Sequence, residues 1–351
     1  MIKIGLNGFG RIGRAIMRIT EERNDCEIVT VNEIDPDVEN SVYLLRYDSV
    51  YGRFKGDVFS NGNTMIINDR KVKIYSELNG LDVPWEKHNV DVLIDATGIR
   101  ENVERAHSLI KKGVPKVIIT HSPKKNIDFS MILGVNEDQY DYKKHNVISS
   151  SICDATAITP LLVELDNKWG IKNCFITTLH PWLSYQNLVD GSLKSVSNPG
   201  HYWQEFSLGR NSTLSLIPKD TTASTATIRV APQLDGKLDA VSFRVPTSIV
   251  SASDMTIQTS SPVNENELRN YLQNLSIARS DLYEYEKENL VSIDYLGNPK
   301  STIIDSNRLK VLNENMVKVI IWYDNEWGYS SRVVDIVKLV NNDKNKVIIN
   351  G

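Results

Sequence analysis

A cysteine at the start of a predicted helix is the residue in this chain best placed to act as a nucleophile. Cys153 follows the strand-like stretch Asn146–Ser150 and directly precedes the helical pattern of Asp154–Lys168. A helix dipole stabilises negative charge at its N-terminus, so we expect the Cys153 thiol to have a lowered pKa. Taken by itself, this position still favours a buried, inert cysteine, the commoner role. Cys26 and Cys174 lie at the edges of apolar strands and are interpreted as structural.

A thiol nucleophile needs a base, and histidine is the side chain that titrates near neutral pH. His180 directly follows the predicted strand Cys174–Leu179, a position suited to presenting an imidazole into a cleft. A surface histidine, or one that is merely hydrogen-bonded, is the usual alternative. Spacing alone does not distinguish His180 from the other histidines, which are His88, His107, His121, His145 and His201.

A glycine-rich turn near the N-terminus indicates a dinucleotide site. The motif Gly8-Phe9-Gly10-Arg11-Ile12-Gly13 follows the predicted strand Ile2–Leu6 and opens a predicted helix. Gly8 permits the tight turn, Gly10 lets the backbone approach a pyrophosphate, and Gly13 allows close packing of helix on strand. The helix N-terminus then faces the phosphates. Glu33 ends the second strand, where its carboxylate would bind ribose hydroxyls and repel a 2′-phosphate, which favours NAD over NADP. A chance glycine turn is the alternative, and this context makes it the weaker one.

The elements that position these residues alternate in the first part of the chain. The predicted strands are Ile2–Leu6, Glu27–Asn32, Val92–Ala96, Lys116–Thr120 and Met131–Val135, and the predicted helices are Gly10–Glu22 and Val103–Lys112. Strand–helix alternation with glycine turns is typical of a parallel, doubly wound sheet. We therefore expect an α/β protein whose residues 1–152 form a Rossmann-type NAD-binding domain.

The second part of the chain has a different rhythm. After the helix Asp154–Lys168 come long strands with period-two patterning, at Cys174–Leu179, Ala240–Val245, Ser253–Thr259 and Val317–Trp322. This pattern indicates an α+β catalytic domain over residues 153–324, with a mostly antiparallel sheet and helices on one face. The last predicted helix, Ser331–Asn341, lies within a C-terminal segment, 325–351, that we expect to pack back on the first domain.

Composition excludes several classes of protein. The chain has 351 residues, with 40 Lys and Arg against 44 Asp and Glu, and 41% of its residues are apolar. It has no apolar run long enough for a membrane span and no basic tract for nucleic acid, so neither a membrane nor a nucleic acid is an expected partner. Three cysteines without a C-x-x-C pair argue against a disulfide scaffold and against a zinc site, so no metal is expected. A reducing compartment and an N-terminus unlike a signal peptide predict a cytoplasmic protein.

With these residues assembled, the chain resembles glyceraldehyde-3-phosphate dehydrogenases over essentially its whole length. The matching segments are Ile4–Arg14, Tyr47-Asp48-Ser49, Gly52-Arg53-Phe54, Ala96-Thr97-Gly98, Phe243–Thr247 and Trp322–Ser330. The first and last of these are highly specific, and all of them occur in the family's order.

The resemblance implies a two-domain fold, a homotetramer, a small aldehyde substrate, NAD, a cysteine nucleophile and a histidine base. It places the nucleophile at Cys153 and the base at His180, and it places Arg244 in the phosphate-binding region. The implied cofactor contacts are Gly8, Phe9, Gly10, Arg11, Ile12, Gly13, Glu33, Thr97, Gly98, Thr120, Asn325 and Tyr329, of which Asn325 holds the nicotinamide amide.

The chain departs from the family where phosphate would bind. The family's Ser-Cys-Thr-Thr-Asn-Cys becomes Ile152-Cys153-Asp154-Ala155-Thr156-Ala157, so Ile152 removes a hydroxyl and Asp154 introduces a carboxylate. A carboxylate about 4 Å from phosphate is repulsive by about 1–4 kcal/mol. Leucines replace an arginine at Leu208 and a threonine at Leu183, and Thr222 replaces a glycine, while Arg210, Thr221 and Arg244 remain as candidates. The loop Ser192–Ser215, which would line the cofactor and a neighbouring subunit, is longer than the family's.

These features favour an NAD-dependent aldehyde dehydrogenase of this family with an altered substrate or acyl acceptor. We expect it to oxidise a small, phosphorylated or otherwise anionic aldehyde through a thiohemiacetal and a thioester on the cysteine. With Arg244 opposed by Asp154, we expect a nearly neutral pocket and weak use of inorganic phosphate. In that reading Asp154 would orient a water or an amine-bearing acceptor, unless it turns outward as an ordinary first-turn acid of the helix. An authentic phosphorylating glyceraldehyde-3-phosphate dehydrogenase is the first alternative, and a non-catalytic NAD-binding regulatory paralogue is the second.

Overall fold

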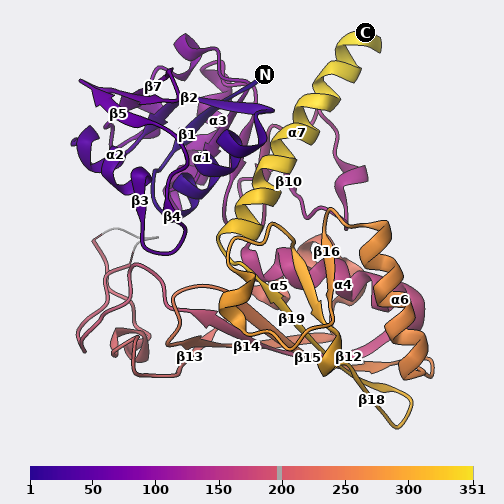
Figure 1. Cartoon of the computed structure of the whole chain (residues 1–351). Helices are drawn as coiled ribbons and strands as arrows, with labels where there is room; N and C mark the ends of the chain where they lie inside the picture. The colour runs from indigo at the N-terminus through magenta and orange to yellow at the C-terminus, as the bar shows by residue number, and fades with distance from the viewer. Residues whose placement is uncertain (196–199, 351) are drawn as a thin grey trace. The chain divides into compact units, whose positions relative to one another are not determined.

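The computed structural model describes residues 1–195 and 200–350, with side chains up to residue 343 (Figure 1). The chain forms two compact units. The first consists of residues 1–131, 139–150 and 330–351, and the second of residues 132–138 and 151–329. No helix among these residues is long and apolar enough to cross a membrane. Residues 196–199 of the loop Ser192–Ser215 lie outside the described part of the chain.

The first unit is built on a nine-stranded sheet in the order β10-β11-β9-β8-β1-β2-β7-β6-β5. Neighbours from β10 to β7 pair in parallel, and β7, β6 and β5 are antiparallel. The strands are β1 Ile2–Asn7, β2 Cys26–Asn32, β5 Val58–Asn61, β6 Thr64–Ile67, β7 Arg70–Tyr75, β8 Val92–Asp95, β9 Val117–Ile119, β10 Phe129–Ser130 and β11 Val147–Ser149. The predicted parallel α/β domain is confirmed.

Helices α1 Arg11–Arg23, α2 Val38–Arg46 and α3 Glu101–Lys111 connect these strands, and β3 Tyr47–Asp48 pairs with β4 Gly52–Arg53. Because β1, β2, β8 and β9 are parallel, their carboxyl ends meet at one edge of the sheet, where such folds bind their ligands. The C-terminal helix α7, Trp327–Asn350, belongs to this unit from Ser330 onward. There Asp335 pairs with Arg23 at 2.7 Å, and Lys338 pairs with Asp25 at 2.6 Å.

The predicted strand Met131–Val135 was wrong. The strand at this point is β10, and it ends at Ser130. A turn follows, in which the Val135 N–H donates to the Ile132 carbonyl at 3.1 Å and Gly134 has a φ of 85°. The Ile132 N–H donates to the Asn136 side chain at 3.0 Å. The apolar residues after Met131 therefore belong to a turn, not to a strand of the sheet.

The second unit contains an eight-stranded sheet in the order β13-β14-β12-β15-β19-β17-β16, with β18 paired to β19. Only β12–β14 and β16–β17 are parallel pairs, which confirms the predicted, mostly antiparallel sheet. The strands are β12 Ile171–Pro181, β13 Ile217–Asp220, β14 Leu238–Val245, β15 Ser251–Thr259, β16 Tyr283–Glu286, β17 Thr302–Asp305, β18 Lys310–Leu312 and β19 Met316–Tyr323.

Helices α4 Cys153–Trp169, α5 Ala223–Val230 and α6 Glu265–Ala278 cover one face of this second sheet, and α4 and α5 lie along the same side of its strands in Figure 1. Leucines and isoleucines of α4 and α6 pack on apolar residues of β12, β15 and β19 in one core. Short 3₁₀ turns complete the chain: η1 Gly80–Asp82, η2 Trp85–His88, η3 Glu137–Gln139, η4 Phe206–Gly209, η5 Pro232–Leu234, η6 Ser292–Tyr295 and η7 Ser306–Arg308.

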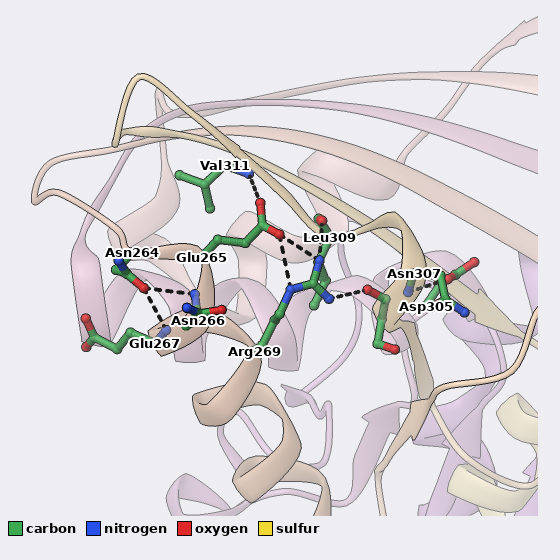
Figure 2. Close-up of polar contacts among 10 residues, drawn as sticks. Asn264, Glu265, Asn266, Glu267, Arg269, Asp305, Asn307, Leu309 and Val311 are labelled. Carbon is green, nitrogen blue, oxygen red and sulfur yellow. Dashed lines mark hydrogen bonds and ion pairs between the residues drawn. The ribbon is translucent and has the colours of Figure 1, made fainter.

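The N-terminus of α6 is fastened by polar contacts that Figure 2 shows. Asn264 caps the helix by accepting from the N–H groups of Asn266 and Glu267 at 2.9 and 3.2 Å. One turn on, Arg269 pairs with Glu265 at 2.8 Å and also donates to the Leu309 carbonyl at 2.9 Å. These bonds hold α6 against the segment that leads into β18.

Candidate active site

Strand register places the predicted base beside a buried arginine. His180 on β12 is paired with Arg244 on β14. Because side chains alternate along a strand, Thr178 and Ser242, two residues earlier on each strand, share this face with them. All four side chains are buried on the side of the sheet that the helices cover. Arg244 Nε has no hydrogen-bond partner among the described residues, so one buried donor is available to a ligand.

Helix α4 brings the predicted nucleophile to this face. The helix begins at Cys153, after Ile152 in an extended conformation. Just before it, Ser151 adopts a left-handed φ of 62°, which costs about 1–3 kcal/mol for a residue with a side chain. The Tyr329 hydroxyl donates to the Ser151 carbonyl at 3.1 Å and helps to hold this bend. The abrupt turn from strand to helix aims the first helical residue at the end of β12.

Cys153 and His180 form the expected pair. The Cys153 sulfur lies 3.6 Å from His180 Nε2. The other ring nitrogen, Nδ1, lies 2.8 Å from the Pro181 carbonyl, which can only accept, so Nδ1 carries the hydrogen and the Nε2 lone pair faces the thiol. Burial, reinforced by Arg244, lowers the pKa of His180 to about 4. The imidazole is therefore a neutral proton acceptor at physiological pH.

The prediction of a lowered pKa for Cys153 was wrong. Burial raises the pKa of this thiol well above its usual value, and the neighbouring Asp154 carboxylate adds to the rise. Arg244 acts in the opposite direction but does not outweigh these two effects. The resting side chain is thus a thiol, and His180 must accept its proton as the nucleophile attacks.

Asp154 points inward, so the alternative of an outward-facing first-turn acid is also wrong. Its carboxylate is buried and accepts from the Tyr323 hydroxyl at 2.7 Å. The same oxygen lies 3.6 Å from the Cys153 sulfur. The Tyr323 hydroxyl also lies 3.2 Å from the Ser253 hydroxyl, which ties this carboxylate to β15 and β19.

Sequence reasoning missed Lys219, a second cation near this pair. Lys219 on β13 lies opposite Ser242, so it shares the face that carries Arg244 and His180. Its charge and that of Arg244 both lower the pKa of His180, while Asp154 raises it. The expectation of a nearly neutral pocket counted Arg244 and Asp154 but not Lys219. Strand alternation from β14 onto β13 is the signal that could have identified it.

The remaining substrate candidates take structural positions. Ile152 packs against Ile132, Ala155, Ala226 and Val230, and Leu208 is buried with Leu193 and Ile217. Arg210 is exposed and pairs with Asp190 at 2.7 Å. The other three lie in turns: the Leu183 N–H donates to Gln186, Thr221 accepts from the Ala223 N–H, and Thr222 is the N-cap residue of α5.

In the first unit, the glycine-rich turn has the shape a pyrophosphate needs. Gly8 has a φ of 94°, and a Cβ at Gly13 would lie 2.3 Å from the Gly8 carbonyl oxygen, so only glycine fits there. A Cβ at Gly10 would meet no atom of the described chain within 4 Å, so the space beside α1 is open. Gly10 precedes α1 as its N-cap and has no capping side chain, which suits a helix N-terminus that binds phosphate.

Side chains at the ends of β1, β2 and β8 brace this turn. Glu33 accepts from the Phe9 N–H at 2.7 Å, which fixes its carboxylate beside the motif. Asp95, fully buried and with its pKa raised by burial, accepts from Asn7 at 2.8 Å and from Thr97 at 2.6 Å. Sequence reasoning missed Asn7 and Asp95, which hold neighbouring strand ends together.

The other predicted cofactor residues of the first unit lie on the same edge of its sheet. Thr120 donates to the Asp95 carbonyl at 3.0 Å, and Gly98 has a φ of 70° in the turn after β8. Arg11 pairs with Asp48 and lies over the Tyr51 ring, while Ile12 is half-buried in the first turn of α1. In the second unit, the buried Oδ1 of Asn325 has no partner among the described residues and could accept from a carboxamide N–H group. The residues of the first unit therefore fit the pyrophosphate and adenosine ribose of NAD, and Asn325 of the second unit fits its nicotinamide.

Known proteins match both units. The family described as the glyceraldehyde 3-phosphate dehydrogenase NAD binding domain matches residues 2–103, and the C-terminal domain of the same enzyme matches residues 152–325. The chain is 37% identical over 343 residues to glyceraldehyde-3-phosphate dehydrogenase 2 of Streptomyces avermitilis, covering 97% of this chain and 99% of the relative. It is 36% identical over 341 residues to glyceraldehyde-3-phosphate dehydrogenase 1 of Kluyveromyces lactis, covering 97% of this chain and all of the relative's length, 100%.

Proposed function

Because this chain belongs to the glyceraldehyde-3-phosphate dehydrogenase family of NAD-dependent oxidoreductases, we propose that it oxidises a small phosphorylated aldehyde through a thioester on Cys153. The observation that carries this proposal is the Cys153–His180 contact of 3.6 Å beside two cations, Arg244 and Lys219. A nucleophile, its base and positive charge for an anionic substrate are thereby assembled on one sheet face.

His180 and the start of α4 perform the first step. As the Cys153 sulfur attacks the aldehyde carbon, His180 Nε2 accepts the thiol proton, because Nδ1 is already committed to the Pro181 carbonyl. The product is a thiohemiacetal, whose oxygen carries developing negative charge. The Cys153 N–H, at the N-terminus of α4, is suited to stabilise that oxygen.

Oxidation of the thiohemiacetal leaves a thioester on Cys153. NAD, when bound, supplies the acceptor for the hydride that this oxidation removes. In the first unit Gly8, Gly10 and Gly13 would hold its pyrophosphate, and Glu33 would bind its adenosine ribose. In the second unit the unpartnered Asn325 Oδ1 would accept from the nicotinamide carboxamide.

Inorganic phosphate is the acyl acceptor that the charges favour. The charged groups acting on His180 are two cations, Arg244 and Lys219, and one carboxylate, Asp154. The Tyr323 hydroxyl partly satisfies that carboxylate, which weakens its repulsion of an anion. Phosphate binding needs charge-assisted donors, and Lys219 adds a second cation on the sheet face that carries Arg244.

Water is the second candidate for the acceptor, because the Asp154 carboxylate lies 3.6 Å from the sulfur that would carry the acyl group. A carboxylate at this distance could orient a water towards the thioester. A phosphate titration of steady-state NADH formation from glyceraldehyde 3-phosphate separates the two. A saturable phosphate requirement supports the phosphorylating reaction, and a rate independent of phosphate supports hydrolysis. Absence of NADH with any small aldehyde, from protein that binds NAD, would refute both and leave a regulatory paralogue.

We also propose that the protein self-associates as a homotetramer, with the sheet face away from the helices as one of its interfaces. Phe175 and Leu179 on β12 are 70% and 40% exposed, and Val241 on β14 is 54% exposed. Contiguous apolar exposure of this kind is typical of an interface. Sedimentation equilibrium should give four times the chain mass of 39.7 kDa, and Phe175→Asp should reduce it. A monomer for the unmodified chain would contradict this proposal.

A further inference from the structure

We propose that Cys153, Asp154 and His180 bind a zinc ion, through the Cys153 sulfur, an Asp154 carboxylate oxygen and His180 Nε2. The three ligand atoms lie within 4.8 Å of one another. They come from the first two residues of α4 and from the end of β12, so they meet only in the folded chain. The proposal goes beyond aldehyde oxidation, which needs no metal ligand at Asp154.

Two of the three donor separations match tetrahedral zinc. Zn–S bonds of about 2.3 Å and Zn–N or Zn–O bonds of about 2.0–2.2 Å, at tetrahedral angles, put sulfur about 3.6 Å from each of the other donors. The Cys153 sulfur lies 3.6 Å from His180 Nε2 and 3.6 Å from Asp154 Oδ1. The third separation, between His180 Nε2 and the Asp154 carboxylate, is at most 4.8 Å, so movement of these side chains could bring it to the roughly 3.4 Å that a tetrahedral ion requires.

Both non-sulfur donors have the outer hydrogen bonds that orient metal ligands. His180 Nδ1 donates to the Pro181 carbonyl at 2.8 Å, which turns Nε2 inward. The Tyr323 hydroxyl donates to Asp154 Oδ1 at 2.7 Å, which holds that carboxylate in place. Such partners fix the direction of the ligand lone pairs and tune metal affinity.

The donor types select zinc over hard cations. A thiolate and an imidazole suit zinc, whereas magnesium and calcium prefer oxygen ligands throughout. Binding requires the Cys153 thiol to release its proton to solvent, after which thiolate and carboxylate together balance the charge of the ion. Arg244 and Lys219 are the nearby cations that oppose binding. Three protein ligands leave a fourth coordination position open to water.

A bound zinc ion would block catalysis, because it occupies the Cys153 sulfur and the His180 lone pair that the reaction uses. This consequence rests on the proposed function, whereas zinc binding itself does not. Asp154 decides whether a Cys–His pair becomes a three-ligand site, and the family's segment has a threonine at that position.

The test is metal binding to the full chain in the absence of NAD. Zinc affinity is measured by competition with a chromophoric chelator, and cobalt substitution reports geometry through tetrahedral d–d bands and a thiolate-to-cobalt charge-transfer band. Loss of an outer partner usually weakens binding by about 10–100-fold, so Asp154→Asn should weaken it by at least about 100-fold and Tyr323→Phe by about 10-fold or more. Asp239→Asn removes an exposed carboxylate on β14 and is the matched control.

Several outcomes would overturn the proposal. These are a cobalt complex without the thiolate band, zinc affinity in folded Asp154→Asn equal to that of the unmodified chain, and zinc affinity in Asp239→Asn as weak as in Asp154→Asn. If Asp154→Asn does not fold, unchanged affinity in Tyr323→Phe overturns it instead. Zinc binding together with the expected cobalt spectrum, in a protein that forms no NADH even without zinc, would refute the proposed function and leave the metal site standing.

Discussion

Replacing Asp154 by asparagine should make Cys153 more reactive, not less. Asp154→Asn keeps the shape of the side chain and an oxygen for the Tyr323 hydroxyl, but it removes the negative charge 3.6 Å from the sulfur. That charge raises the pKa of the Cys153 thiol because it repels the thiolate. Without it the pKa should fall, so more thiolate should be present at neutral pH.

The distance sets the size of the effect. Two unit charges 3.6 Å apart interact by about 1 kcal/mol in a water-like medium and by about 5 kcal/mol at an effective dielectric constant of about 20. Even the smaller value is close to one pKa unit, which means about tenfold more thiolate below the pKa. A less basic thiolate is also a weaker nucleophile, so the net gain is about threefold for each unit.

The assay is the rate of alkylation by iodoacetamide, a neutral reagent, followed from pH 6 to about pH 10, near and above the range in which thiols ordinarily titrate. In the unmodified chain the rate should still rise beyond pH 9, because the pKa of Cys153 lies above its usual value. In Asp154→Asn the profile should shift to lower pH, with at least about threefold faster alkylation at pH 7. The other cysteines do not interfere, because Cys26 and Cys174 are buried whereas Cys153 is partly exposed. Equal or slower alkylation in a natively folded variant would refute the electrostatic account.

Three further predictions concern charge recognition, the cofactor and stability. Lys219→Met removes a charge-assisted contact worth about 2 kcal/mol, so kcat/KM for a phosphorylated aldehyde should fall by about 30-fold. The value for the unphosphorylated aldehyde should change little. Equal losses for the two substrates, or no rescue by Lys219→Arg, would contradict the role of Lys219. The Glu33 carboxylate, fixed by the Phe9 N–H, should make kcat/KM at least about 100-fold higher with NAD than with NADP, and similar values would exclude it from the ribose site. Asn264→Ala removes the cap of α6 and should lower stability by about 1 kcal/mol and Tm by about 2 °C, whereas the exposed Asn270→Ala should not; matching melts would show that the cap contributes little.

Much of the fold could be predicted, because its strong elements are locally determined. The period-two runs of β12, β14, β15 and β19 and the glycine turn before α1 are visible in short windows of sequence. The hairpin strands β5, β6 and β7 were missed although Asn68 and Asp69, both at positive φ, mark a tight turn. The stretch after β10 was misjudged because its apolar residues resemble a strand, while Gly134 and the Asn136 side chain make it a turn.

The candidate site likewise contains features that short windows of sequence predict and features that they do not. Cys153 and Glu33 follow from their place after a strand and beside a glycine motif, which sequence spacing reveals. The raised pKa of Cys153, the inward direction of Asp154 and the presence of Lys219 depend on register and burial, which arise only when distant strands pair. A helix-dipole argument considers one helix, whereas the desolvation that outweighs it comes from the whole domain.

The strand order also bears on how such an enzyme can change over evolutionary time. β12 and β14, which carry His180 and Arg244, lie inside the sheet between neighbours on both sides, whereas β13, which carries Lys219, is its terminal strand. A substitution on β12 or β14 disturbs packing on two flanks, but one on β13 disturbs a single ladder. Substitutions at His180 or Arg244 should therefore cost the fold more than substitutions at Lys219, for which we propose a role in substrate recognition. Substitutions that change substrate preference within a lineage should therefore accumulate on the terminal strand β13, while the residues on the inner strands stay constant.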